Sequence, residues 1–180
     1  MIDSIKLRSP YTRNIKRYLN KDFGSDDVYM NNIKLDEYIK FGKYDKHDVF
    51  ALIRNSEISA IMAVKISTFN EVVNSCSVVI NTYCRRYENE KCLFIEYFNR
   101  NSKISQNKNK GDGVIMMDML KNQCRKMNIN IICLEADGVN PDKLAQNYYM
   151  KIGFIPCSEK YNVNDWTGEL IFMVCDLREL

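Results

Sequence analysis

The sequence is poor in histidine and has no long apolar segment. His47 is its only histidine and lies in the polar run KYDKHD, so we expect it at the surface and do not expect a nucleophile activated by histidine. No segment approaches the roughly 20 apolar residues needed to cross a bilayer, and the N-terminal stretch has no apolar core of signal-peptide length. We therefore expect a soluble, cytoplasmic protein without a membrane partner.

Paired metal-ligand spacing and a strong charge excess are also missing. The seven cysteines are odd in number and none are spaced C-x-x-C, so they predict reduced core side chains instead of disulfides or a zinc site. No metal is expected. Lysine and arginine total 26 against 23 acidic residues, and this net charge of +3 is too small to indicate nucleic-acid binding by itself.

The length of 180 residues, 46% of them hydrophobic, suits one domain covering residues 1–180. Apolar patterns with a period of two, or short apolar runs, predict strands at 2–7, 75–83, 91–98, 129–136, 154–157 and 168–177, with a hairpin of two strands over 48–68. Helical spacing predicts helices at 11–19, 34–41, 114–127 and 140–150, the last ended by Gly153. This order predicts an α/β or α+β sheet with helices on its faces.

The loop NKNKGDG, residues 107–113, precedes a helix whose apolar face contains four side chains: Met116, Leu120, Cys124 and Met127. We expect this apolar face to pack in the hydrophobic core. The first N–H groups of a helix attract anions, and glycines ahead of them let the backbone approach a phosphate closely. The loop is therefore either a diphosphate cradle or a plain turn. It matches neither G-x-x-x-x-G-K-[ST] nor G-x-G-x-x-G, because Met116 stands where the third glycine would be.

Three motifs in order resemble the GNAT superfamily of N-acetyltransferases. The family signature R/Q-x-x-G-x-G/A is similar to residues 108–113, although Lys108 replaces the first Arg or Gln and provides only a point charge. FIEYF, residues 94–98, looks like the family's fourth strand. LAQNYYMKIGF looks like its later A-x-x-F/L-Y-x-x-x-G-F motif, which Ala145, Tyr148, Tyr149, Gly153 and Phe154 match. The resemblance covers residues 91–154.

The resemblance implies a mixed, mostly antiparallel sheet of about six to seven strands, splayed between the fourth and fifth, with helices on both faces. It also implies acetyl-CoA as cosubstrate. The diphosphate would lie on the loop formed by Lys108, Asn109, Lys110, Gly111, Asp112 and Gly113. The pantetheine arm would pair with backbone at Phe98, Asn99 and Arg100. Homodimers are common in the family.

Two side chains are candidates for the chemistry of acetyl transfer. The resemblance implies that Tyr149 protonates the leaving thiolate, since a tyrosine of pKa about 10 stays neutral until then. The alternative is a core aromatic, which is the role expected for Tyr148. Glu96 would accept the amine proton, directly or through water; otherwise it faces solvent or an ion pair.

The acceptor is expected to be a primary amine of a small molecule or a peptide. One alternative is a toxin-type GNAT that acetylates aminoacyl-tRNA, because DFGS and KLDEYI resemble the N-terminal segment of such toxins. Apart from that tRNA, no nucleic-acid partner is expected. Another alternative, favoured by Lys108 and the long loop, is a degenerate fold that binds CoA without turnover.

Overall fold

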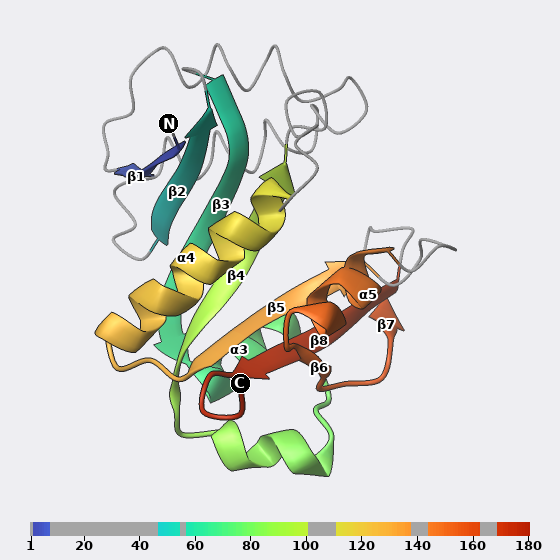
Figure 1. The fold of residues 1–180 in the computed structure, drawn as a ribbon. Coiled ribbons are helices and arrows are strands. Elements are labelled where there is room, and N and C mark those ends of the chain that lie inside the picture. The colour runs from blue at the N-terminus through green and yellow to red at the C-terminus, as the bar shows by residue number, and fades with distance from the viewer. Residues whose placement is uncertain (1, 8–46, 55–56, 101–110, 138–143, 163–168) are drawn as a thin grey trace. The chain divides into compact units, whose positions relative to one another are not determined.

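The computed structural model describes residues 2–7, 47–54, 57–100, 111–137, 144–162 and 169–180. Within them the hydrogen-bonded strand order is β1-β2-β3-β4-β5-β8-β6, with β7 paired to β8 (Figure 1). The strands are β1 (Ile2–Leu7), β2 (His47–Arg54), β3 (Glu57–Thr68), β4 (Lys91–Arg100), β5 (Ile131–Asp137), β6 (Ile155–Pro156), β7 (Tyr161–Asn162) and β8 (Glu169–Asp176). The predicted helices at 11–19 and 34–41 lie outside the described residues.

The chain folds into two compact units, residues 1–65 with 97–119 and residues 66–96 with 120–180. In the first unit, β1 pairs antiparallel with β2, and β2 pairs antiparallel with β3. Both pairs follow the predicted strands at 2–7 and 48–68. The buried run Ala60–Val64 makes β3 the core strand of this unit. The expectation of a single domain over residues 1–180 stays a prediction.

The second unit is built on β5, which pairs parallel with β4 and antiparallel with β8. The side chains of Ile131, Ile132, Cys133 and Leu134 are all buried, so this strand is covered on both faces, as the apolar run predicted. Strands β6 and β7 add two short antiparallel pairings to β8. The mixed, mostly antiparallel sheet predicted from the sequence is confirmed.

One predicted strand is wrong. Residues 75–83 contain the end of helix α3 (Phe69–Cys76), an extended stretch, and the start of the 3-10 helix η1 (Thr82–Tyr87). Val78 is buried and Val79 exposed, so the apolar alternation exists, but this stretch makes only one described bridge, between Ile80 and Ser158. An alternating pattern without a partner ladder does not make a strand.

Helix α3 was missed although its start signal is present. Thr68 is the N-cap: its hydroxyl accepts the Glu71 N–H at 3.3 Å, and the Glu71 carboxylate accepts the Thr68 N–H at 3.1 Å. This reciprocal capping box satisfies two of the N–H groups that a helix start leaves open. Ser77, with φ of 52°, ends the helix in the left-handed region.

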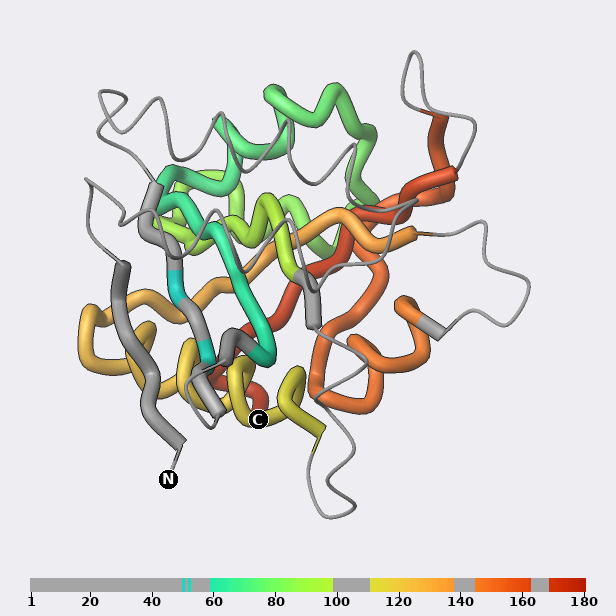
Figure 2. Tube along the Cα trace, turned by 90° about the horizontal axis from the view of Figure 1, so that it is seen from above, coloured from blue at the N-terminus to red at the C-terminus, as the bar shows by residue number. Residues whose placement is uncertain are grey.

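Helices cover both faces of the sheet in the second unit. On one face α3 and η1 enclose an aromatic core in which Phe69 contacts Tyr87 and Phe172 edge-on, with ring centroids 5.7 and 5.9 Å apart. On the other face α5 (Leu144–Lys151) packs against β5, and Figure 2 shows α3 and α5 on opposite sides of β8. The predicted helix 140–150 is thus confirmed for its described part.

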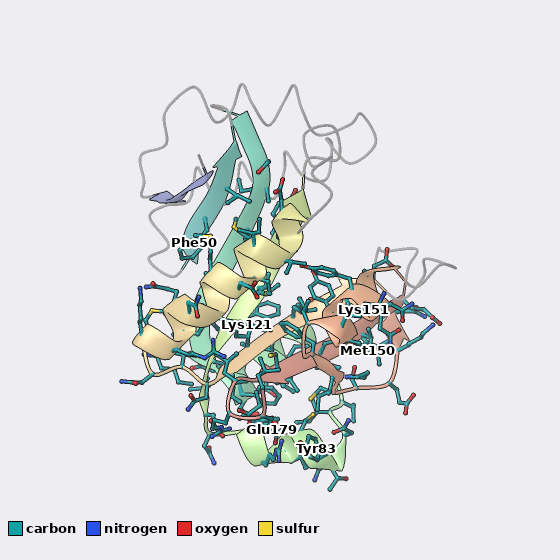
Figure 3. All side chains as sticks on the ribbon, viewed as in Figure 1. Phe50, Tyr83, Lys121, Met150, Lys151 and Glu179 are labelled. Atoms are coloured by element: carbon teal, nitrogen blue, oxygen red, sulfur yellow. The ribbon has the colours of Figure 1, made fainter. Side chains whose placement is uncertain are left out.

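Helix α4 (Asp112–Lys126) carries the predicted apolar face. Met116, Leu120 and Cys124 are buried, as expected of core side chains, while Met127 follows the helix and is half-buried. Lys121 is also buried, and its Nζ donates to the carbonyl oxygen of Ile152 just after α5 (Figure 3). This hydrogen bond joins the C-terminal half of α4 to the end of α5 within the second unit.

The cysteines belong to the core, as predicted. All seven are free thiols; Cys76 is half-buried and the others are buried. Burial raises the pKa of Cys124 to about 12, and Cys133 donates to the sulfur of Cys92 across 3.7 Å. Among the described residues, no helix is both long enough and apolar enough to cross a membrane.

Gly153 ends α5, as its sequence position predicted, with φ of +97°. We expect Gly153→Ala to lower the free energy of unfolding by about 1–3 kcal/mol, because L-residues rarely adopt this backbone conformation. The added Cβ would also stand 2.4 Å from the Leu180 Cδ2, although that side-chain tip can rotate away. Denaturant titration measures the loss.

Gly111→Ala is the matched control for this prediction. In the described part of the chain, a Cβ at Gly111 meets nothing within 4 Å, and Gly111 does not have a left-handed φ, so the stability of the Gly111→Ala protein should stay close to wild type. A Gly153→Ala protein as stable as the Gly111→Ala protein would contradict the expected backbone strain.

Candidate acetyl-transfer site

The start of α4 combines a glycine with open space around it. The Gly111 carbonyl accepts the N–H groups of Val114 at 2.9 Å and Ile115 at 3.3 Å, so the helical hydrogen bonds begin here. Among the described residues other than its chain neighbours, nothing lies within 4 Å of where a Gly111 Cβ would stand, so they leave an anion room to approach the backbone at this point. The predicted diphosphate loop therefore ends in a suitable helix start.

The remaining members of that predicted loop are less informative. Asp112, the first residue of α4, is only 2% exposed, so its contribution to an anion site would come from its backbone. Gly113 follows it in the helix and is buried. Lys108, Asn109 and Lys110 lie outside the described residues.

Strands β4 and β5 stop pairing in the middle of the sheet. Their parallel ladder runs from Cys92 opposite Ile131 to Ile95 opposite Leu134 and goes no further among the described residues. Both strands nevertheless continue, β4 to Arg100 and β5 to Asp137. The predicted separation of the fourth and fifth strands is confirmed by this early end of the ladder.

Predicted site residues on β4 follow the end of the ladder. Glu96 is the first residue beyond it and is half-buried. Phe98 is half-buried, and Asn99 and Arg100 complete the strand. In the described residues beyond the ladder, the β4 backbone does not pair with β5. The predicted pairing of β4 with pantetheine requires this.

Sequence reasoning missed a carboxylate at the matching position of β5. Glu135 is the first residue of β5 beyond the same ladder, and it accepts a hydrogen bond from the Tyr161 hydroxyl on β7. The Cys76 thiol at the end of α3 also bonds to Glu135. Burial, together with the negative charges of Glu135 and then Glu96, raises the pKa of Cys76 to about 12, which indicates that both carboxylates lie close to this thiol.

Tyr149 lies on α5, where its ring packs between two other aromatic rings. Its centroid is 5.1 Å from that of Tyr148 and 5.6 Å from that of Phe154. Burial raises the pKa of Tyr149 above its usual value, so the hydroxyl stays protonated at neutral pH. The α5 C-terminus that carries it is fixed because the Tyr149 carbonyl accepts the N–H groups of Ile152 and Phe154.

Other sequence features do not add to this site. His47 is the first residue of β2. In the described part of the chain, no three His, Cys, Asp or Glu side chains gather in a way that could hold a metal ion. The segments DFGS and KLDEYI, on which the toxin resemblance rests, lie outside the described residues.

Comparison with known proteins gives a clear result only at the level of structure. No family profile matches the sequence, and no curated protein matches it. Among solved structures, a protein described as a GNAT-family acetyltransferase from Desulfovibrio desulfuricans is similar with a TM-score of 0.67 at 9% identity, over 98% of this chain and 99% of that chain.

Two further solved structures carry information about ligands or activity in their descriptions. One is the NatC complex bound to Gag peptide and CoA, similar with a TM-score of 0.58 at 14% identity over 98% of each chain. Another is a bacterial toxin, with a TM-score of 0.61 at 15% identity over 99% of this chain and 92% of that one. At such identities the shared property is the fold, and this chain has the fold of the GNAT acetyltransferases.

Proposed function

We propose that the chain is an acetyl-CoA-dependent N-acetyltransferase that transfers the acetyl group directly to a primary amine of a small molecule or peptide. The observation that carries the proposal is the open helix start at Gly111 in a chain with the GNAT fold. A similar solved structure is described as bound to CoA and a peptide, which supports this choice of donor and acceptor.

The residues at the start of α4 suit the diphosphate of the donor. The helix dipole and the N–H groups around Gly111–Gly113 favour a negative group there, and Lys108 and Lys110 stand just ahead of them in the sequence. The backbone of Phe98, Asn99 and Arg100 would hold the pantetheine arm by strand-like hydrogen bonds, because β5 does not pair with that part of β4.

Proton transfers are assigned to two side chains. As the new N–C bond forms and the C–S bond breaks, Glu96 takes the proton that leaves the amine nitrogen. Tyr149 gives its proton to the departing thiolate, and the raised pKa of its buried hydroxyl keeps that proton available. Direct transfer needs no covalent intermediate on the protein.

A thermal melt with and without acetyl-CoA tests the proposal. Acetyl-CoA at about 100 times its dissociation constant should stabilise the fold by roughly 2.7 kcal/mol and raise Tm by several degrees. CoA should act similarly, and ATP should not. If neither acetyl-CoA nor CoA raises Tm, both the proposed donor binding and the proposed acetyltransferase activity are overturned.

An amine panel then identifies the acceptor class. We would measure CoA release by chromatography with spermidine, a short peptide with a free N-terminus, and an aminoacyl-tRNA. Turnover with spermidine or the peptide supports the main proposal. Turnover with the tRNA alone, together with growth arrest on expression, would favour the second candidate, which similarity to a bacterial toxin supports. A CoA-dependent shift without any turnover would indicate a CoA-binding protein.

A further inference from the structure

Three elements of the second unit converge on one carboxylate. Glu135 on β5 accepts hydrogen bonds from the Tyr161 hydroxyl on β7 and from the Cys76 thiol at the end of α3. Burial and the adjacent Glu135 charge raise the pKa of Tyr161, so its hydroxyl remains a donor at neutral pH. The orientation of the Glu135 carboxylate is therefore held from two sides.

Glu135 and Glu96 point to the same face of the sheet. Phe94 and Cys133 both belong to the core under α3, and side chains on a strand alternate between faces. Glu96 and Glu135 each come two residues later, so they also face α3. Each glutamate is the first residue beyond the parallel ladder, directly after the paired residues Ile95 and Leu134, and the charges of both act on the Cys76 thiol.

Glu96 and Glu135 place two carboxylates on one face of neighbouring strands, and such a face attracts a cation. A primary amine reaches an enzyme at neutral pH mostly as an ammonium ion, with a pKa near that of lysine. An ammonium loses two protons on the way to an amide. Glu96 takes the first and passes it to water, which leaves a neutral amine, and takes the second as the N–C bond forms, so the amine must be held near Glu96. A second carboxylate fixed beside Glu96 meets that need, since hydrogen bonds to charged groups are strong and directional.

We propose that Glu135 binds the acceptor ammonium beside Glu96, and that Tyr161 is the positioning residue that holds the Glu135 carboxylate. The inference rests on the proposed function and narrows its substrates to amines that arrive as cations. Glu135 adds no proton transfer to the reaction. The amine then approaches the sheet from the face covered by α3.

Tyr161→Phe tests the positioning role because it removes a single hydroxyl. With the best acceptor of the amine panel, KM for the amine should rise by roughly tenfold or more, while kcat changes less and the thermal shift with acetyl-CoA is retained. Glu135→Gln, which keeps the shape and removes the charge, should raise the same KM at least as much. Glu135→Gln also tests the proposed ammonium binding if Tyr161→Phe fails to fold.

Tyr83→Phe is the matched control. The Tyr83 hydroxyl also bonds a carboxylate, that of Glu179, at 3.2 Å, but on the exposed side of η1 (Figure 3). Removal of the Tyr83 hydroxyl should leave KM for the amine and KM for acetyl-CoA unchanged. If Tyr161→Phe lowers Tm but leaves KM for the amine equal to that of Tyr83→Phe, Tyr161 is only structural and the inference is overturned. Wild-type protein that binds no CoA, or turns over no amine, overturns the proposed function itself.

Discussion

Replacing Tyr149 by phenylalanine should lower kcat by roughly 100-fold or more, the usual loss when a positioned general acid is removed. The thiolate would then leave without a proton donor, while the ring and its contacts with Tyr148 and Phe154 remain. Binding of the donor should be unaffected, so the thermal shift with acetyl-CoA should persist. Initial rates at saturating amine and acetyl-CoA measure the effect.

Tyr148→Phe is the control, because it removes the same atom from the neighbouring residue of α5. Its kcat should stay within a few-fold of wild type. Equal losses in both variants would indicate a general disturbance of the helix. An unchanged kcat in Tyr149→Phe would remove Tyr149 from the acid role and leave it as a core aromatic.

The pH dependence gives a second check on Tyr149. Its pKa is raised above the usual value of about 10, so the acid form persists and its ionisation should cause no fall in kcat below about pH 10. The stability that goes with this raised pKa is fully present below the unfolded pKa and is lost as pH rises through the folded one. A fall in kcat centred near pH 8 would point to a different acid.

Replacing Gly111 by leucine should remove most of the stabilisation by acetyl-CoA and raise its KM roughly tenfold or more, a loss of about 1.4 kcal/mol or more. The Leu side chain would occupy the open space ahead of α4 that we assign to the diphosphate. Stability without ligand should hardly change, because the added Cβ meets no atom of the described residues within 4 Å, its chain neighbours apart. Melts at several acetyl-CoA concentrations separate the two effects.

Asn122→Leu places the same side chain on an exposed position of the same helix. It should leave the acetyl-CoA shift and KM at wild-type values. A Gly111→Leu protein that keeps the full shift would show that the start of α4 does not hold the diphosphate, and the loop would then be a plain turn.

Strong local patterns explain which elements were predicted. The β2 and β3 runs and the helical face of Met116 each carry a period that fixes the element type without distant partners. The strand around Cys133 is instead a short, almost wholly apolar run, as expected of a strand buried on both faces. The strand at 75–83 failed because a strand also needs a partner ladder, which no local pattern reveals. The T-x-x-E capping box at Thr68 would have predicted α3.

The site was predictable only where motifs carry it. Gly111, Glu96 and Tyr149 were found through their motifs, and their roles remain predictions. Glu135 has a weaker signal of the same kind as Glu96, one carboxylate inside an apolar strand, IICLEAD. No sequence signal pointed to Tyr161. Its strand, β7, has only two residues, and its position near Glu135 depends on the pairing of β7 with β8.

The chain passes from one compact unit to the other at residues 65/66, 96/97 and 119/120, and each passage lies inside β3, β4 or α4. Independent domains are normally joined by exposed linkers that can be cut or lengthened. Here, excising either unit would cut through two strands and a helix. Neither unit can therefore be removed or exchanged as a separate domain without cutting these three elements.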